Sequence, residues 1–328
     1  MTIGLNEIVQ AQERIADHLR RTPLISSAAL TTLCGAPIHL KLESRQATGS
    51  FKLRGATNAV LSLSDEARQR GLVTASTGNH GRALAHAASA QGARAVVCMS
   101  ALVPGNKVDA VRALGADVRI VGHSQDDAQQ EVERLVTEAG LTEIPPFDHA
   151  AVIAGQGTIG LEIFEDCPGV DLVLVPLSGG GLASGVAAAI KGRLPRARVI
   201  GVSMARGAAM HESLRAGKPV AVEELETLAD SLGGGVGLNN QYTFAMCRDL
   251  LDDVVLLTED EIAEGIRHAF VAEGEMVEGA GAVGIAALLA SKVEVRGPTV
   301  VLVSGRNIDE ARHRQLVSHR EDAAGGRS

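Results

Sequence analysis

The stretch DLVLVPLSGGGLASG, residues 171–185, decides which fold class this chain of 328 residues adopts. Its first part, 171–178, is a continuous apolar run, which is typical of a strand that is buried on both faces. A cluster of glycines follows directly, and a helix-like pattern begins after it. The order of strand, glycine loop and helix predicts a parallel sheet that is covered by helices.

The same alternation of short apolar strands and helices continues on both sides of this stretch. We predict further strands at 39–44, 72–76, 93–99, 116–122, 198–204, 252–258 and 299–305. The predicted helices are an amphipathic one at the N-terminus, 81–91, one from Pro104 to Gly115, 124–139 and 259–272. This pattern predicts an α/β protein in which two parallel-sheet domains face each other.

Residues 141–155 interrupt the alternation. Two adjacent prolines, Pro145 and Pro146, and a turn indicate that the chain crosses between domains there. We expect residues 1–68 and 150–328 to form a large domain that binds the ligand, and residues 69–149 to form a small mobile domain.

Composition and charge exclude several classes of protein. The net charge of -8 argues against a non-specific nucleic-acid binder, which needs a basic face. The N-terminus lacks the pattern of a signal peptide, and no uncharged apolar run is long enough to span a bilayer. The four cysteines are widely separated, which predicts free thiols and neither a disulfide framework nor a zinc site. We therefore expect a soluble, cytoplasmic protein without nucleic-acid or membrane partners.

The glycine loop is the first candidate binding site. Glycines let the backbone approach an anion, and the free N–H groups at the start of a helix bind it. A tight turn without a ligand is the alternative. A dinucleotide motif would need glycine at Ser184, and no lysine stands where a P-loop has one. A single phosphate is the better interpretation, and the residues that would bind it are Ser178, Gly179, Gly180, Gly181 and Leu182.

Two other loops also follow predicted strands. The loop STGNHG, residues 76–81, offers hydroxyls, an amide and an imidazole at a helix start, which suits a carboxylate. The alternative is a helix N-cap formed by Ser76, Thr77 or Asn79. Ser304 ends the last predicted strand, where its hydroxyl could bond a ring nitrogen or cap the next helix.

Lys52 lies in the segment QATGSFKLRGA, residues 46–56, where a helix begins near Ser50. The positive end of the helix dipole and partial burial both disfavour an ammonium group there. An amine with a lowered pKa is a nucleophile for carbonyl carbons. Of the six lysines, Lys52 alone is preceded by small residues that could admit a ligand, although an ordinary surface charge is the alternative.

Together these groups specify one kind of ligand. An aldehyde suits Lys52, a phosphate suits the glycine loop, and a heteroaromatic nitrogen suits Ser304. Pyridoxal 5′-phosphate carries all three groups, and an amino-acid substrate supplies a carboxylate for the STGNHG loop.

The sequence resembles the fold-type II pyridoxal-phosphate enzymes of the threonine/serine dehydratase and serine racemase family, whose fold is like that of the tryptophan synthase β subunit. The resemblance covers nearly the whole chain. It is carried by RTPL (21–24), TGSFKLRGA (48–56), STGNHGRALA (76–85), GQGTIGLEI (155–163), SGGGLASG (178–185), GLNN (237–240) and SGRNID (304–309).

The resemblance implies a role for each candidate residue. Lys52 would carry the Schiff base, with Phe51 beside the cofactor ring and Asn79 bonded to the phenolic oxygen. Ser178, Gly179, Gly180, Gly181 and Leu182 would hold the phosphate, and Ser304 would face the pyridine nitrogen. The substrate carboxylate would bind at Ser76, Thr77, Asn79 and His80. The catalytic residues would be Lys52, Ser76 and Thr77.

Some positions depart from the family pattern. Thr77 stands where serine racemases have a serine, so its extra methyl disfavours racemisation. Ser203, Gly207 and Ala209 stand near the places of the acidic metal ligands of eukaryotic racemases, which predicts no metal there. Within the family, LADSLGGGVGLNNQYTF (228–244) is most similar to the hydroxyectoine-utilization dehydratases. The relatives also imply a homodimer or homotetramer.

The resemblance implies β-elimination of water from a β-hydroxy amino acid, which is threonine, serine or a hydroxyectoine-derived hydroxydiaminobutyrate. A serine or aspartate racemase is the first alternative. Three others are β-replacement with a sulfur nucleophile, pyridoxal-phosphate binding without turnover, and nicotinamide-dependent oxidation. The forms of the glycine loop and of the STGNHG loop argue against β-replacement. The missing dinucleotide motif argues against nicotinamide-dependent oxidation.

Overall fold

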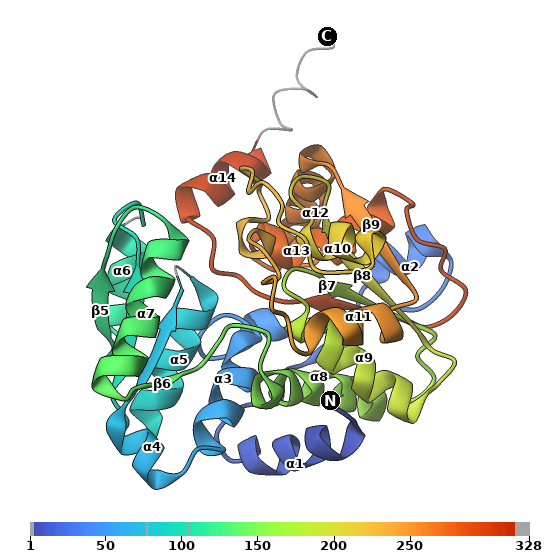
Figure 1. Ribbon diagram of the computed structural model, residues 1–328. Coiled ribbons are helices and arrows are strands. Elements are labelled where there is room, and N and C mark those ends of the chain that lie inside the picture. Colours follow the sequence, from blue (N-terminus) through green and yellow to red (C-terminus); the bar gives the residue numbers. More distant parts are fainter. Residues whose placement is uncertain (1–2, 77, 104, 319–328) are drawn as a thin grey trace.

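Two parallel sheets organise the computed structural model, which describes residues 3–76, 78–103 and 105–318. The larger sheet has the strand order β1-β2-β10-β7-β8-β9 and is parallel except for β1, which pairs antiparallel with β2. The smaller sheet is parallel throughout, in the order β5-β4-β3-β6. The predicted α/β class with two parallel-sheet units is confirmed (Figure 1).

The strands of the larger sheet are β1 (Leu24–Ser26), β2 (Ile38–Leu42), β7 (Leu172–Pro176), β8 (Arg198–Met204), β9 (Asp253–Leu257) and β10 (Thr299–Val303). Those of the smaller sheet are β3 (Leu72–Ala75), β4 (Ala95–Met99), β5 (Asp117–Ile120) and β6 (Thr142–Glu143). Both β7 and β10 are buried along their whole length, as their continuous apolar runs predict. The exact domain limits and the mobility of the smaller unit stay predictions.

Helices cover these sheets. The first group is α1 (Leu5–Ile15), α2 (Ala28–Cys34), α3 (Lys52–Leu61), α4 (Asp65–Arg70), α5 (Asn79–Ala90), α6 (Gly105–Arg112) and α7 (Gln125–Ala139). The second group is α8 (Ala150–Asp166), α9 (Gly181–Arg193), α10 (Ala209–Ala216), α11 (Thr243–Leu250), α12 (Glu259–Val271), α13 (Gly279–Leu289) and α14 (Glu310–Ser318). Two short 3₁₀ turns, η1 (Glu43–Arg45) and η2 (Asp230–Leu232), lie at the carboxyl end of β2 and in the long segment after α10.

Several helix and strand limits differ from the sequence prediction. The prediction missed β1 and β6, which have three and two residues and thus too few positions to show a pattern. Helix α5 starts at Asn79 instead of Gly81. Helix α8 starts at Ala150, inside the stretch that the prediction treated as a crossing between domains.

The glycines of α8 explain why the start of this helix was not recognised in the sequence. A Cβ on Gly155 would lie 2.7 Å from the Arg54 carbonyl oxygen of α3, and one on Gly160 would lie 2.9 Å from the Val186 carbonyl oxygen of α9. These glycines therefore allow the backbones of α3 and α9 to approach α8 closely. In the sequence they resemble helix breakers, although tertiary packing overrides that propensity.

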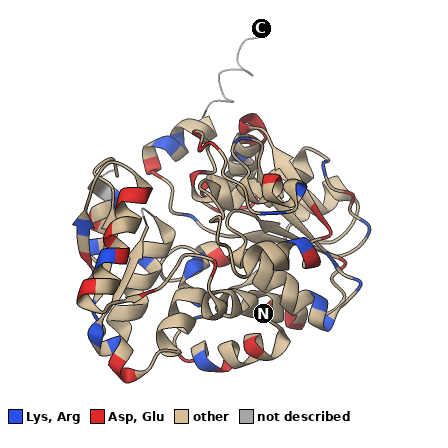
Figure 2. Cartoon of the chain, in the orientation of Figure 1, with Lys and Arg blue, Asp and Glu red and all other residues tan. Residues whose placement is uncertain are grey.

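The charged groups lie mainly on the outer helices, where both signs are interspersed (Figure 2). The four cysteines are free, as predicted. Within the described ranges, no helix is long and apolar enough to cross a membrane.

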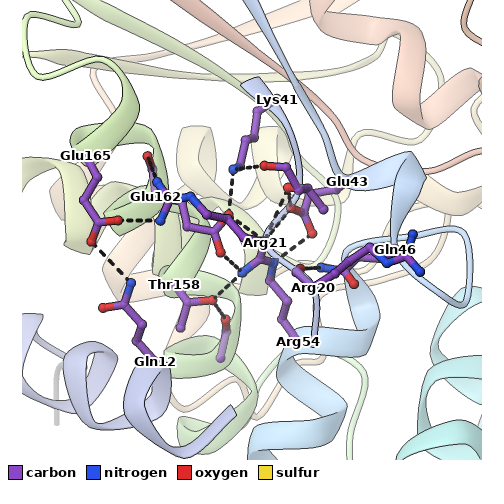
Figure 3. Close-up of polar contacts among 12 residues, drawn as sticks. Gln12, Arg20, Arg21, Lys41, Glu43, Gln46, Arg54, Thr158, Glu162 and Glu165 are labelled. Atoms are coloured by element: carbon purple, nitrogen blue, oxygen red, sulfur yellow. Dashed lines mark hydrogen bonds and ion pairs between the residues drawn. The ribbon is translucent and has the colours of Figure 1, made fainter. Parts of the chain in front are cut away.

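A buried ionic network joins α3 to the larger sheet and to α8 (Figure 3). The Arg54 guanidinium donates to both carboxylate oxygens of Glu43, at 2.9 and 2.8 Å, and to both of Glu162, at 2.6 and 2.9 Å. Lys41 Nζ donates to Glu162 Oε2 at 2.6 Å and to the Thr22 carbonyl oxygen at 2.7 Å. Two cations thus face two carboxylates, so the buried charges balance.

The electrostatics of this network favour the charged forms of Arg54 and Glu162. Burial by itself raises the pKa of the Glu162 carboxyl, but the Arg54 and Lys41 cations outweigh it, and the net shift is downward. Burial by itself lowers the pKa of Arg54, and the two carboxylates reverse that shift. Because Arg54 lies two residues after Lys52 on α3, the network fixes the place where Lys52 enters the molecule.

Replacing Arg54 by methionine is expected to destabilise the protein by about 3–5 kcal/mol, because the buried Glu43 carboxylate loses its cationic partner and Glu162 keeps only Lys41. The free energy of unfolding from urea denaturation measures this loss. Arg134→Met on α7 is the matched control, because Arg134 pairs with Glu131 and Glu138 at the surface and its loss costs about 1 kcal/mol or less. Equal losses in the two variants would contradict a structural role of the network.

Candidate active site

A cavity of about 580 Å³ lies at the carboxyl ends of strands from both sheets. In parallel α/β sheets this is the position where ligands bind. The cavity is lined by every predicted site residue that the structure describes: Phe51, Lys52, Ser76, Asn79, His80, Ser178, Gly179, Gly180, Gly181, Leu182 and Ser304. Thr77 lies outside the described residues. The structure thus brings together loops that are far apart in the sequence.

The glycine loop forms the start of α9, directly after β7. Gly180 is the N-cap of the helix and has φ +90°, a conformation that favours glycine. A Cβ on Gly179 would lie 2.5 Å from Phe147 Cγ, and one on Gly181 would lie 2.9 Å from the Phe147 Cα. The helix ladder begins with Ser184 N–H donating to the Gly180 carbonyl oxygen, so the preceding N–H groups are available to an anion.

The loop between β3 and α5 holds a second helix start. The N-cap residue of α5 is Gly78, not Ser76 or Asn79, but Ser76 Oγ accepts from the Gly81 N–H in the first turn at 3.0 Å. The hydroxyl hydrogen of Ser76 remains able to donate. Both features suit a carboxylate at this helix start, and the assignment of the substrate carboxylate to this loop stays a prediction.

His80 is buried beside the cavity and is uncharged. Its Nε2 lies 2.8 Å from the Ile144 carbonyl oxygen, which assigns the hydrogen to Nε2. Burial lowers the pKa of His80 to about 3, and the positive charge of Lys52 adds to the effect. The ring therefore offers no positive charge to a carboxylate, and its predicted contact with the substrate stays a prediction.

The carboxamide of Asn79 is held at both ends. Its nitrogen donates to Glu278 Oε1 at 2.8 Å, and its oxygen accepts from Asn307 Nδ2. The nitrogen carries two hydrogens, and its other contact is a long one to Ser231 Oγ at 3.5 Å, so the second hydrogen can be offered to a ligand. This geometry suits the predicted bond from Asn79 to a phenolic oxygen.

Glu278 is a site residue that the sequence prediction missed. It is the N-cap of α13, is 3% exposed and lines the cavity. Burial raises the pKa of its carboxyl to about 7, and the nearby Asp230 adds to the rise. The available signal was a single acid directly before a long run of small apolar residues, EGAGAVGIAALLA (278–290).

Lys52 begins α3, as predicted, and its amine points into the cavity. Nζ donates to the Pro146 carbonyl oxygen at 2.7 Å and lies 5.3 Å from the centroid of the Phe51 ring. Burial lowers the pKa of Lys52 to about 8, although the Glu278 carboxylate opposes the shift. Above pH 8 most of the side chain is therefore a neutral amine, which is the nucleophilic form.

Ser304 follows β10 and is 2% exposed. Its hydroxyl lies 3.3 Å from the Ala280 carbonyl oxygen, to which it can donate. The alternative that Ser304 caps the next helix is wrong, because Asp309 Oδ1 accepts the N–H groups of Ala311 and Arg312 there.

These groups fit pyridoxal phosphate. A loop without Cβ atoms suits the phosphate, an amine with a lowered pKa suits the aldehyde, and a neutral hydroxyl suits the pyridine nitrogen. No cluster of three or more His, Cys, Asp or Glu side chains that could hold a metal occurs among the described residues. The expected lack of a metal near Ser203, Gly207 and Ala209 stays a prediction.

The lowered pKa of Lys52 predicts a pH profile for its chemical reactivity in the protein without cofactor. The neutral fraction should reach half its maximum near pH 8, because burial removes the proton well below the usual value of about 10.4. Acetylation of Lys52 by acetic anhydride, followed by peptide mass spectrometry from pH 6 to 11, measures this. Exposed Lys218 provides an internal reference in the same sample. A Lys52 midpoint at or above 10 would contradict the account.

Comparison with known proteins agrees with this site. Residues 15–305 match the family model described as "Pyridoxal-phosphate dependent enzyme". A provisionally named threonine dehydratase of Sinorhizobium fredii is 62% identical over 317 residues, which cover 96% of each chain. The L-threonine ammonia-lyase of Thermotoga maritima is 42% identical over 308 residues, which cover 94% of this chain and 76% of that protein.

Among solved structures, maize serine racemase superposes with a TM-score of 0.91 at 32% identity, covering 99% of each chain. These similarities span the cavity and both sheets. The chain therefore belongs to the pyridoxal-phosphate-dependent enzymes of fold type II, among the homologues of threonine dehydratase and serine racemase.

Proposed function

We propose that the chain eliminates water from a β-hydroxy amino acid and releases a 2-keto acid and ammonia. The single observation that carries the proposal is the convergence of the Lys52 amine, the glycine loop and the Ser304 hydroxyl on one cavity. The relatives named as threonine dehydratase and L-threonine ammonia-lyase support the choice of reaction. Threonine and serine are the simplest substrates of this class.

Each residue has a task in this reaction. Bound pyridoxal phosphate supplies the aldehyde for the substrate amine and an electron sink for the Cα carbanion. The neutral amine of Lys52 takes the Cα proton at Nζ, and the Pro146 carbonyl oxygen orients that amine. Ser76 and the start of α5 bind the substrate carboxylate. Asn79, fixed by Glu278 and Asn307, orients the cofactor ring.

The leaving hydroxyl needs a proton. The glycine loop would hold the cofactor phosphate, and that group would supply an acid within the cavity. Loss of the Cα hydrogen and the Cβ hydroxyl removes one water. Hydrolysis of the released product takes up one water and yields the keto acid and ammonia. The net conversion is therefore balanced without an external oxidant.

The finer proposal concerns the substrate side chain. Residues 230–235, within the segment that resembles hydroxyectoine-utilization dehydratases, line the cavity, together with Glu224. Asp230 is also paired with Lys107 at 3.3 Å. Because Lys107 offsets only one of the two carboxylates, Glu224 and Asp230, the charge at this end of the cavity stays negative. It favours a substrate whose side chain carries a positive charge, such as a hydroxydiaminobutyrate.

A racemase is the second candidate, and the similarity to maize serine racemase favours it. Both activities begin with removal of the Cα proton by Lys52. They differ in whether the hydroxyl leaves or the proton returns to the opposite face.

A substrate panel separates these possibilities. Keto acid and Cα epimerisation should be measured for threonine, serine, 3-hydroxyaspartate and hydroxydiaminobutyrates. We expect keto-acid formation to dominate, and Asp230→Asn to lower kcat/KM for hydroxydiaminobutyrate by about tenfold while threonine changes less. Epimerisation faster than keto-acid formation for every substrate would favour the racemase.

Ser304→Asp tests the role of the neutral hydroxyl. An aspartate at this position would favour a protonated pyridine nitrogen in the bound cofactor, which would make the ring a stronger electron sink and so slow expulsion of the β-hydroxyl. We expect kcat for keto-acid formation to fall by about tenfold or more, a loss of about 1.4 kcal/mol per factor of ten in transition-state stabilisation. Ser304→Ala is the control, since it stays neutral and should lose less. Full elimination activity in Ser304→Asp would contradict this role.

A further inference from the structure

Asp148 connects two parts of the chain that are distant in sequence. Its Oδ2 accepts the Gln241 N–H at 2.6 Å, and its Oδ1 accepts the N–H groups of Tyr242 and Thr243, each at 2.9 Å. These donors lie at the start of α11, where the helix ladder leaves N–H groups without partners. A charged acceptor makes these hydrogen bonds stronger than those to a neutral side chain.

The two residues before Asp148 line the cavity. The Pro146 carbonyl oxygen accepts from Lys52 Nζ at 2.7 Å. Phe147 lies against the glycine loop. A Cβ added to Gly179 or to Gly181 would clash with Phe147. Residues 146–148 therefore contact the reactive amine, the anion-binding loop and α11 in succession.

Helix α11 approaches the same loop from the other side. A Cβ on Gly180 would lie 3.0 Å from both Thr243 Cβ and Cys247 Sγ. The Ser184 hydroxyl lies 3.4 Å from the Thr243 carbonyl oxygen, to which it can donate. The glycine loop is thus held between Phe147 and α11, and the Asp148 carboxylate joins these two supports.

We propose that Asp148 is a positioning residue that sets the separation between the Lys52 amine and the glycine loop. Pyridoxal phosphate needs both groups at once, because its aldehyde and its phosphate arm are attached to neighbouring carbons of one rigid ring, which fixes their separation. The proposal rests on the cofactor dependence of the family and is independent of the reaction that follows.

A positioning role of Asp148 predicts different effects on ligands that carry one or both of these groups. A ligand with both groups gains affinity because the second contact is made within the same complex, and this gain depends on the spacing of the two sites. Pyridoxal, which lacks the phosphate, tests the amine alone, and inorganic phosphate tests the loop alone. Loss of the Asp148 carboxylate should therefore weaken the binding of pyridoxal phosphate more than the binding of pyridoxal or of inorganic phosphate.

The experiment compares dissociation constants in wild type and Asp148→Asn, starting from protein stripped of cofactor. Absorbance titrations give the values for pyridoxal phosphate and pyridoxal, and competition gives the value for phosphate. We expect pyridoxal phosphate to bind about tenfold or more weakly in Asp148→Asn, and each part to change by about threefold or less. Unchanged affinity for pyridoxal phosphate, or an equal loss for the separate parts, would overturn the proposal.

Two further variants exclude a general loss of stability. Glu261→Gln weakens another acceptor at a helix start, because Glu261 Oε2 accepts the Thr258 N–H at the beginning of α12. It should lower the unfolding temperature without changing cofactor affinity. Asp148→Glu keeps the charged acceptor and shifts it by one methylene, so it should fold and lose part of the affinity. The positioning role would be refuted if both Asp148→Glu and Asp148→Asn bound pyridoxal phosphate as tightly as wild type. A tenfold loss of pyridoxal-phosphate affinity in Glu261→Gln would refute it as well.

Discussion

The pairing of Arg54 with Glu43 and Glu162 is the constraint on which the active site depends. The guanidinium is 2% exposed and bonds to all four oxygens of two carboxylates that come from η1 and α8. An arginine in this geometry tolerates little displacement, because its planar fork must meet both carboxylates at once. The start of α3 is fixed in this way, and Lys52 is its first residue.

The chemistry of the cavity follows from burial acting on opposite charges. Burial lowers the pKa of Lys52 to about 8 and raises the pKa of Glu278 to about 7. Both shifts bring the groups towards neutrality near physiological pH, where a proton can be taken up or released at low cost. Asn79 is hydrogen-bonded to this acid and lines the same cavity.

The sequence predicted the parts of the site that local patterns encode. Glycines after a buried strand predict an anion loop, and the first turn of a helix predicts a perturbed lysine, because both depend on neighbours in sequence. Glu278 and Asp148 were missed. Their partners, Asn79 and Gln241–Thr243, are about 200 and 93–95 residues away, and spacing along the chain does not reveal such contacts. Helix α8 was obscured because its glycines serve packing against α3 and α9.

The central claim is that the Lys52 amine forms the covalent bond to pyridoxal phosphate. Borohydride reduction of the protein with bound cofactor, followed by peptide mass spectrometry, measures this bond directly. The account predicts one modified peptide, with the reduced cofactor on Lys52, and none in Lys52→Ala. Modification at Lys107, which also lines the cavity, with unmodified Lys52 would contradict it.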